Sequence, residues 1–183
     1  MSADGRPRTP MDLAAMKAAG RRIVMLTCYD ALFARLLDSA DVDVLLVGDS
    51  VQQVLGGHAN TLAATLDQMI YHAAAVRRGT RTLTFVDLPF LTYQVSVEEA
   101  IRNAGRVLQE TDAHGVKLEG GAVMAPTVSA LVERGIPVMG HLGFTPQSVN
   151  ALGGYRVQGR APDAAERLVA DAASLERAGA CAV

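Results

Sequence analysis

The chain has 183 residues, half of them hydrophobic and a fifth charged, so it can bury a core as one domain and is neither disordered nor collagen-like. Its 17 basic and 19 acidic residues give a net charge of -2, without the basic stripe that nucleic-acid binding requires. No apolar run approaches the ~20 residues of a membrane span and no signal peptide is evident, so we expect a cytoplasmic protein without nucleic-acid or membrane partners.

Apolar runs of strand length alternate along the chain with longer segments of helical periodicity. The predicted strands are Ile23 to Tyr29, Val42 to Val47, Leu83 to Val86, Gly115 to Leu118 and Pro137 to Gly140. The predicted helices are Asp30 to Ala40, Thr65 to Arg78, Ser96 to Glu110, Ala122 to Arg134 and Asp163 to Ala178. This order predicts an α/β fold in which crossover helices join parallel strands.

The number of repeats favours a barrel over an open sheet. An open doubly wound sheet usually carries a glycine-rich phosphate motif after its first strand, and none is present. Residues 181–183 follow the last predicted helix as the start of a sixth strand would. Because a (β/α)8 TIM barrel needs ~250 residues, we expect one truncated after about five and a half β/α repeats. Residues 1–11 are then a flexible N-terminal tail, and residues 12–183 a partial barrel domain without its C-terminal third.

Three successive predicted strands each present an acidic residue at their carboxyl end: Asp49, Asp87 and Glu119. Each of them, taken singly, could instead cap a helix or a turn. The carboxyl ends of parallel strands meet at one edge of a sheet or barrel, where three carboxylates would repel one another unless a cation offsets them. Oxygen ligands without histidine or cysteine favour Mg²⁺.

Two further strand-end residues have two interpretations each. Lys117 lies two residues before Glu119 and points to the same side of its strand, so it either pairs with Glu119 or holds an anionic substrate. His141 follows the fifth strand, where an imidazole could act as an acid, a base or a hydrogen-bond donor, or form an ordinary structural hydrogen bond. The sequence pattern alone leaves both pairs of alternatives open.

Several segments together resemble one known family. They are LTCYDALFA, VLLVGDS, YHAAAVRRG, DLPF, VKLEGG and GHLGFTPQSVNALGGYRVQGR. In this order they closely resemble ketopantoate hydroxymethyltransferase, also called 3-methyl-2-oxobutanoate hydroxymethyltransferase, and the similarity runs from about residue 12 to residue 183. The last segment is long enough to be specific, whereas VGDS or DLPF alone would be weak evidence.

The resemblance implies a TIM-barrel enzyme of pantothenate biosynthesis. Such an enzyme transfers a hydroxymethyl group from 5,10-methylenetetrahydrofolate to 3-methyl-2-oxobutanoate, giving 2-dehydropantoate through a Mg²⁺-stabilised enolate, and its family members are decamers. By motif position, Asp49, Asp87 and Glu119 resemble the metal ligands; Asp49, Ser50, Asp87 and Lys117 resemble the ketoacid-binding set; and His141 resembles a residue that lines the site. The folate is a cosubstrate.

One expectation from the resemblance concerns the general base. The family's base is a glutamate on the next strand, which would lie beyond Val183, so we expect this chain to be inactive alone unless His141 serves as the base. Two alternatives remain: another Mg²⁺-dependent 2-oxo-acid lyase or mutase barrel, and a non-catalytic chain that keeps ligand or subunit contacts. The GHLGFTPQS segment favours the hydroxymethyltransferase.

Overall fold

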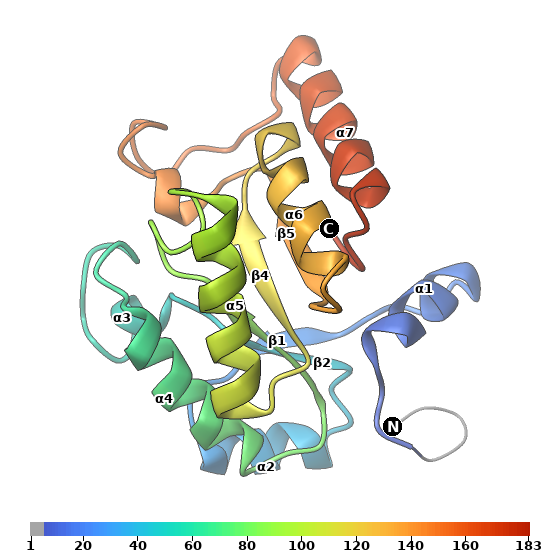
Figure 1. Ribbon diagram of the computed structural model, residues 1–183, viewed down its shortest axis with the longest axis vertical. Helices are drawn as coiled ribbons and strands as arrows, with labels where there is room; N and C mark the ends of the chain where they lie inside the picture. The colour runs from blue at the N-terminus through green and yellow to red at the C-terminus, as the bar shows by residue number, and fades with distance from the viewer. Residues whose placement is uncertain (1–5) are drawn as a thin grey trace.

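The computed structural model describes residues 6–183 and contains a five-stranded parallel sheet (Figure 1). The strands are β1 (Met25–Thr27), β2 (Val44–Val47), β3 (Leu83–Asp87), β4 (Gly115–Glu119) and β5 (Val138–His141). Their spatial order is the same as their order in the chain, β1-β2-β3-β4-β5. This order without reversal is that of a barrel, because an open doubly wound sheet changes direction at a switch point. The predicted barrel-type α/β fold is confirmed.

The helices follow the strands as predicted, with three additional short elements. The α-helices are α1 (Pro10–Ala18), α2 (Ala31–Ser39), α3 (Val51–Val54), α4 (Leu66–Arg77), α5 (Val97–Thr111), α6 (Ala125–Val132) and α7 (Pro162–Arg177), and the 3-10 helices are η1 (Ala122–Met124) and η2 (Pro146–Ser148). The sequence did not predict α1, α3 or η2. Within residues 6–183, no helix combines the length and the apolar character needed to cross a membrane.

Most predicted boundaries differ from the structure by one or two residues, and two elements differ more. The predicted strand from Ile23 to Tyr29 shortens to the three residues of β1, and the predicted helix from Ala122 to Arg134 divides into η1 and α6. Pro126 stands in the first turn of α6, where its missing N–H costs no helical hydrogen bond. The predicted start of a sixth strand is present as a parallel bridge between Met139 and Ala182.

The described part of the predicted flexible tail is held against the sheet. Arg8 is only 4% exposed, and its Nη2 lies 3.0 Å from Oδ1 of the buried Asp43. Pro10 and Met11 belong to α1, so the helix begins inside the predicted tail. Residues 1–5 of that tail lie outside the described residues.

Side chains that alternate along the strands form two apolar clusters. Leu45 and Val47 of β2 face the helices, where α2, α4, α5 and α6 pack side by side in chain order (Figure 1). Val44 and Leu46 face the inner side of the sheet, where Leu13 of α1 packs against them. Helices therefore cover one face of the sheet, and α1 covers part of the other.

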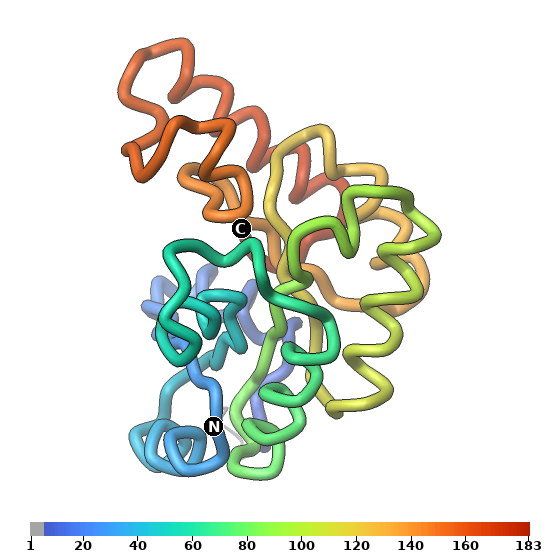
Figure 2. The backbone as a smooth tube through the Cα atoms, turned by 90° about the vertical axis from the view of Figure 1, so that its left-hand side faces the viewer, coloured from blue at the N-terminus to red at the C-terminus, as the bar shows by residue number. Residues whose placement is uncertain are grey.

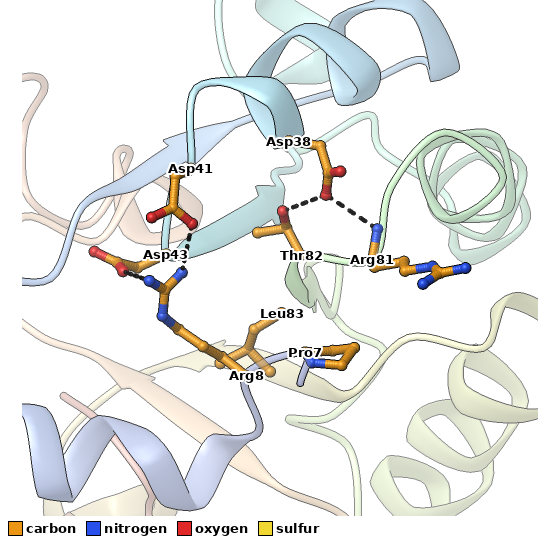
Figure 3. A pocket seen from close by; sticks show the side chains of 8 residues that line it. All are labelled: Pro7, Arg8, Asp38, Asp41, Asp43, Arg81, Thr82 and Leu83. Atoms are coloured by element: carbon orange, nitrogen blue, oxygen red, sulfur yellow. Dashed lines mark hydrogen bonds and ion pairs between the residues drawn. The ribbon is translucent and has the colours of Figure 1, made fainter. Parts of the chain in front are cut away.

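The two ends of the sheet have different surroundings. At the carboxyl ends of the strands, the long segment between β5 and α7 approaches the segment after α3 (Figure 2). Tyr155 Oη donates there to Ala59 O at 3.0 Å. At the opposite end, a cavity of ≈30 Å³ lies beside Arg8, Asp43 and Leu83 (Figure 3). That volume suits about one water molecule, so the cavity is far too small for a substrate.

Candidate active site

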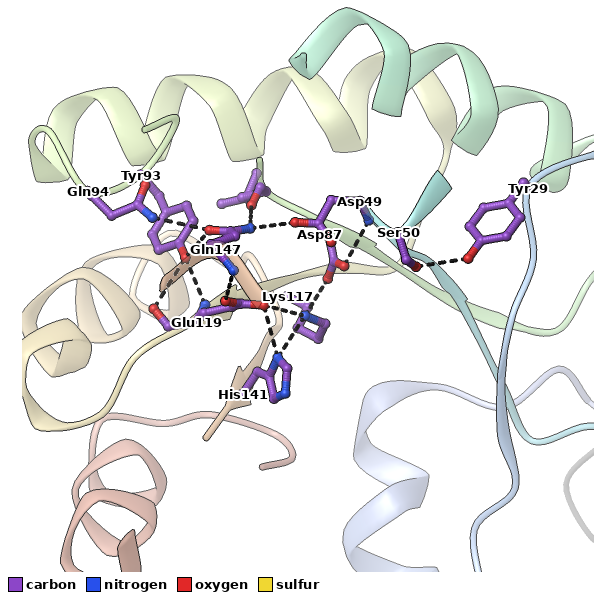
Figure 4. Close-up of polar contacts among 11 residues, drawn as sticks. Tyr29, Asp49, Ser50, Asp87, Tyr93, Gln94, Lys117, Glu119, His141 and Gln147 are labelled. Carbon is purple, nitrogen blue, oxygen red and sulfur yellow. Dashed lines mark hydrogen bonds and ion pairs between the residues drawn. The ribbon is translucent and has the colours of Figure 1, made fainter. Parts of the chain in front are cut away.

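The carboxyl ends of β2 to β5 bring most of the predicted site residues together (Figure 4). Asp87, Glu119 and His141 are the last residues of β3, β4 and β5, and Asp49 follows β2. The strand register sets Asp87 beside Lys117, and Glu119 beside His141. Asp49 and Asp87 are each 3% exposed and Glu119 is 6% exposed, so their charges interact with little screening from water.

Lys117 forms its shortest ion pair with Asp87. Its Nζ lies 2.7 Å from Asp87 Oδ1 and 4.0 Å from Glu119 Oε1. The pairing with Glu119, one of the two alternatives from the sequence, is therefore the weaker contact. Burial alone would lower the pKa of Lys117, but the negative charges of Asp87 and Glu119 outweigh burial and raise this pKa. The ammonium group therefore stays charged at the centre of the site.

The burial of Asp49 among these acids changes its pKa. Burial, and then the charge of Asp87, raise the pKa of Asp49 to about 6, against the opposing effect of a hydrogen bond from Gln147. The backbone N–H of Asp49 donates to Asp87 Oδ2 at 3.1 Å, so the two residues are in direct contact. Three buried carboxylic groups interact with the charge of one lysine, and negative charge is left in excess.

Glu119 is engaged on both carboxylate oxygens. Oε1 lies 3.1 Å from His141 Nδ1, and Oε2 accepts the backbone N–H of Gln147 at 3.0 Å. His141 Nδ1 also lies 3.4 Å from Lys117 Nζ. The side chain of His141 is 33% exposed, against 3% for Glu119, which makes it the member of this group most accessible to a substrate.

Ser50 lies beside Asp49 and contacts the end of the first strand. Ser50 and Tyr29 share a hydrogen bond of 2.8 Å between their hydroxyl oxygens. Gly48 permits this arrangement, because a Cβ at that position would lie 2.7 Å from Ser50 Oγ. The backbone oxygen of Tyr29 is held in turn by His72 Nδ1 at 2.8 Å. Ser50 is thus placed at the rim of the acidic group.

The sequence did not single out Gln147 or Tyr93, which complete the site. Gln147 in η2 donates from Nε2 to Asp49 Oδ2 at 2.9 Å, and Tyr93 Oη donates to Gln147 Oε1 at 2.7 Å. Burial raises the pKa of Tyr93, so its hydroxyl keeps the proton that it donates. Only its place in the GFTPQS segment could have identified Gln147 as a site residue. A loop glutamine carries no charge and belongs to no periodic pattern that would predict a function.

The sequence model of one family, described as ketopantoate hydroxymethyltransferase, matches residues 8–183. The chain belongs to the ketopantoate hydroxymethyltransferase family. The family resemblance inferred from the sequence motifs is confirmed, and the match includes every strand end that carries the acidic group.

Curated relatives carry the name 3-methyl-2-oxobutanoate hydroxymethyltransferase. One from Azoarcus sp. (strain BH72) is 58% identical over 181 residues, which are 98% of this chain and 66% of the relative. One from Thermobifida fusca (strain YX) is 56% identical over 96% of this chain and 63% of the relative. The chain therefore spans slightly less than two thirds of the length of these family members.

Solved structures with low sequence identity share the fold. A putative phosphonomutase from Burkholderia cenocepacia J2315 has a TM-score of 0.70 at 16% identity, over 92% of this chain and 72% of that one. Phosphonopyruvate hydrolase in complex with oxalate and Mg²⁺ has a TM-score of 0.67 at 12% identity, over 94% of this chain and 61% of that one. 2,3-Dimethylmalate lyase, a member of the PEP mutase/isocitrate lyase superfamily, has a TM-score of 0.61 at 19% identity, over 94% and 59%.

The donor atoms fit a hard divalent cation at Asp49 and Asp87. Both side chains are buried carboxylates, the backbone N–H of Asp49 contacts Asp87 Oδ2, and the local negative charge exceeds what Lys117 offsets. Among the described residues, no three or more His, Cys, Asp or Glu side chains are grouped closely enough to hold a metal ion. Mg²⁺ is commonly held by one or two carboxylates plus water and substrate, so this pair suffices in number. The role of Glu119 as a third metal ligand stays a prediction.

Proposed function

We propose that this chain takes part in the transfer of a hydroxymethyl group from 5,10-methylenetetrahydrofolate to 3-methyl-2-oxobutanoate, which gives 2-dehydropantoate for pantothenate biosynthesis. The observation that carries the proposal is the buried group of Asp49, Asp87 and Glu119 around Lys117 at the carboxyl ends of the strands. Barrel enzymes place their active sites at this end. Membership of the hydroxymethyltransferase family supports the choice of reaction.

Asp49 and Asp87 would hold Mg²⁺, and Lys117 and Ser50 would orient the carboxylate of the ketoacid. A bound Mg²⁺ would supply positive charge beside the oxygens of the 2-oxo acid and so lower the cost of removing the proton from C3. Lys117 adds a fixed positive charge in a region from which water is largely excluded, since its side chain is 8% exposed. Ser50, already held by Tyr29, offers a hydroxyl in a fixed position.

His141 is placed to hold a proton near the substrate. Its Nδ1 lies 3.1 Å from the acceptor Glu119 Oε1 and 3.4 Å from the donor Lys117 Nζ, and the shorter contact favours the tautomer with the proton on Nδ1. Nε2 is then left as an acceptor on the more exposed part of the ring. We assign His141 to the substrate region, as a group that could accept or return a proton at C3.

We also propose a cytoplasmic location, which is the expectation from the sequence, and a homo-oligomeric, decameric assembly, which rests on the family resemblance. Size-exclusion chromatography with light scattering gives the mass of the assembly directly. A monomer under conditions where the chain is folded would contradict the oligomeric part of the proposal.

A second candidate is another Mg²⁺-dependent 2-oxo-acid lyase or mutase, favoured by the fold shared with phosphonopyruvate hydrolase and 2,3-dimethylmalate lyase. Calorimetric titration of the chain with 3-methyl-2-oxobutanoate, phosphonopyruvate and 2,3-dimethylmalate, each with Mg²⁺, separates the two candidates. We expect 3-methyl-2-oxobutanoate to bind most tightly. Tighter binding of either other acid would replace our proposal with the second candidate.

A further inference from the structure

Gln147 joins segments that are far apart in the sequence. Its side chain is buried, with the residue 4% exposed, and its Nε2 donates to Asp49 Oδ2 and to Leu88 O, each at 2.9 Å. Its Oε1 accepts from Tyr93 Oη at 2.7 Å and from Gln94 Nε2 at 3.2 Å. All four hydrogen-bonding positions of the amide are therefore used.

The backbone of Gln147 extends the same contacts to the next strand. Its N–H donates to Glu119 Oε2 at 3.0 Å, and the N–H of Glu119 donates to Tyr93 Oη at 3.0 Å (Figure 4). Tyr93 is 1% exposed, so these bonds lie in a region of low dielectric constant where they are strong. One glutamine thus contacts Asp49, which follows β2, and Glu119, the last residue of β4.

The hydrogen-bond partners of Gln147 fix the orientation of its side-chain amide. Tyr93 and Gln94 both donate to the oxygen of Gln147, so its nitrogen must face Asp49. A reversed amide would set an NH₂ group against both donors and an oxygen against the Asp49 carboxylate. The contact uses Oδ2 of Asp49, and no hydrogen bond among the described residues engages its Oδ1. That oxygen is left for a ligand.

We propose, on the basis of the function proposed above, that Gln147 is a positioning residue that holds Asp49 and Glu119 in place for the cation and the ketoacid. Hydrogen-bond partners of metal-binding carboxylates set ligand orientation, and their loss commonly lowers metal affinity 10- to 100-fold. Tyr93 acts one step further out by fixing the amide of Gln147. Both residues act through the acids and do not themselves touch the reacting atoms.

The test compares Gln147→Leu with a matched control, Gln158→Leu. Gln158 lies in the same segment after β5 but its Nε2 donates only to Arg156 O, outside the acidic group. Mg²⁺ affinity is measured by calorimetry with and without 3-methyl-2-oxobutanoate, circular dichroism checks folding, and crystal structures of the ligand-free proteins give the position of Asp49. We expect Gln147→Leu to lose at least tenfold in Mg²⁺ affinity with a displaced Asp49, and Gln158→Leu to change less than twofold.

Equal Mg²⁺ affinity in folded Gln147→Leu and wild-type protein would overturn the assignment. If Gln147→Leu fails to fold, Tyr93→Phe replaces it, because this change removes only the hydroxyl oxygen; we expect about a fivefold loss of affinity, and no loss overturns the assignment. If the wild-type chain binds no Mg²⁺, the proposed function fails. The ligand-free structures then test the positioning role of Gln147 separately. An Asp49 carboxylate unmoved in the variant then rejects the positioning role, and a displaced one supports it.

Discussion

Lys117 Nζ lies 2.7 Å from Asp87 Oδ1, and both side chains are less than a tenth exposed. The two residues are direct partners in the parallel register of β3 and β4. The ion pair thus joins neighbouring strands at the end where the acidic residues meet. Because its single positive charge serves three carboxylic groups, removing it leaves buried negative charge without compensation.

We predict that Lys117→Met destabilises the folded protein by about 3 to 5 kcal/mol at pH 7.5, the usual cost of breaking a buried ion pair by removing one partner. Urea denaturation gives the free energy of unfolding. Lys17→Met, on the exposed side of α1, is the control and should change stability by less than about 0.5 kcal/mol. A similar small change for Lys117→Met would show that the acids need no cation in the folded state.

We predict that Asp49 makes the metal-free protein less stable as the pH rises from about 4 to 6. Its pKa is raised from 3.8 to about 6, mainly by burial and then by Asp87, so the folded state holds the proton more tightly than the unfolded chain. This contribution to stability is complete below the unfolded pKa and is lost as the pH passes the folded one, a change of about 3 kcal/mol.

Asp49→Asn removes this titration. The free energy of unfolding of the variant should therefore rise relative to that of the wild type across the same pH range. Urea denaturation in the presence of EDTA at several pH values from 4 to 7 measures the difference between the two proteins. A difference that stays constant with pH would mean that Asp49 is not held with a raised pKa.

We predict that Tyr29→Phe weakens ketoacid binding about fivefold, because Ser50 loses the hydroxyl partner that lies 2.8 Å away. Tyr71→Phe, at a residue 69% exposed on α4, should leave binding unchanged. Calorimetry with 3-methyl-2-oxobutanoate and Mg²⁺ measures both variants. Unchanged ketoacid affinity in Tyr29→Phe would show either that Ser50 does not orient the substrate or that Ser50 keeps its position without Tyr29.

We predict opposite effects of two glycine-to-alanine substitutions. At Gly115, which begins β4, a Cβ would lie 2.6 Å from the backbone oxygen of Pro137 and from the ring of Phe85, so Gly115→Ala should cost about 1 to 3 kcal/mol. At Gly105, inside α5, no atom outside the adjacent helix backbone lies within 4 Å of the added Cβ, so Gly105→Ala should stabilise the protein by up to about 1 kcal/mol. Thermal and urea unfolding compare the two. Stabilisation by Gly115→Ala would contradict the packing of β4, and destabilisation by Gly105→Ala would contradict the open surroundings of Gly105.

The acidic strand ends could be predicted from sequence because they depend on local pattern. An apolar run buried on both faces identifies a parallel strand, and an acid directly after it must lie at the carboxyl end of the sheet, as Asp87 and Glu119 do. The main partner of Lys117 was missed for a related reason. Spacing along one strand pointed to Glu119, whereas register across two strands sets Asp87 closer.

Gln147 and helix α1 could not be predicted because their contacts are distant in sequence. Gln147 reaches Asp49 across 98 positions, and no local pattern encodes that contact. Helix α1 is short, and its buried residues Leu13 and Met16 gain a partner only when the inner face of the sheet exists. The tertiary structure, not local propensity, decides both cases.

The most direct test of our account is calorimetric titration of the chain with 3-methyl-2-oxobutanoate in the presence of Mg²⁺, repeated with EDTA and with Asp87→Asn. This variant keeps the size of Asp87 but removes the charge that contacts Asp49 and Lys117. We predict saturable binding by the wild-type chain with Mg²⁺, and a loss of at least tenfold in affinity both with EDTA and in Asp87→Asn. Ketoacid binding of equal strength with and without Mg²⁺, and in wild type and variant alike, would contradict the account.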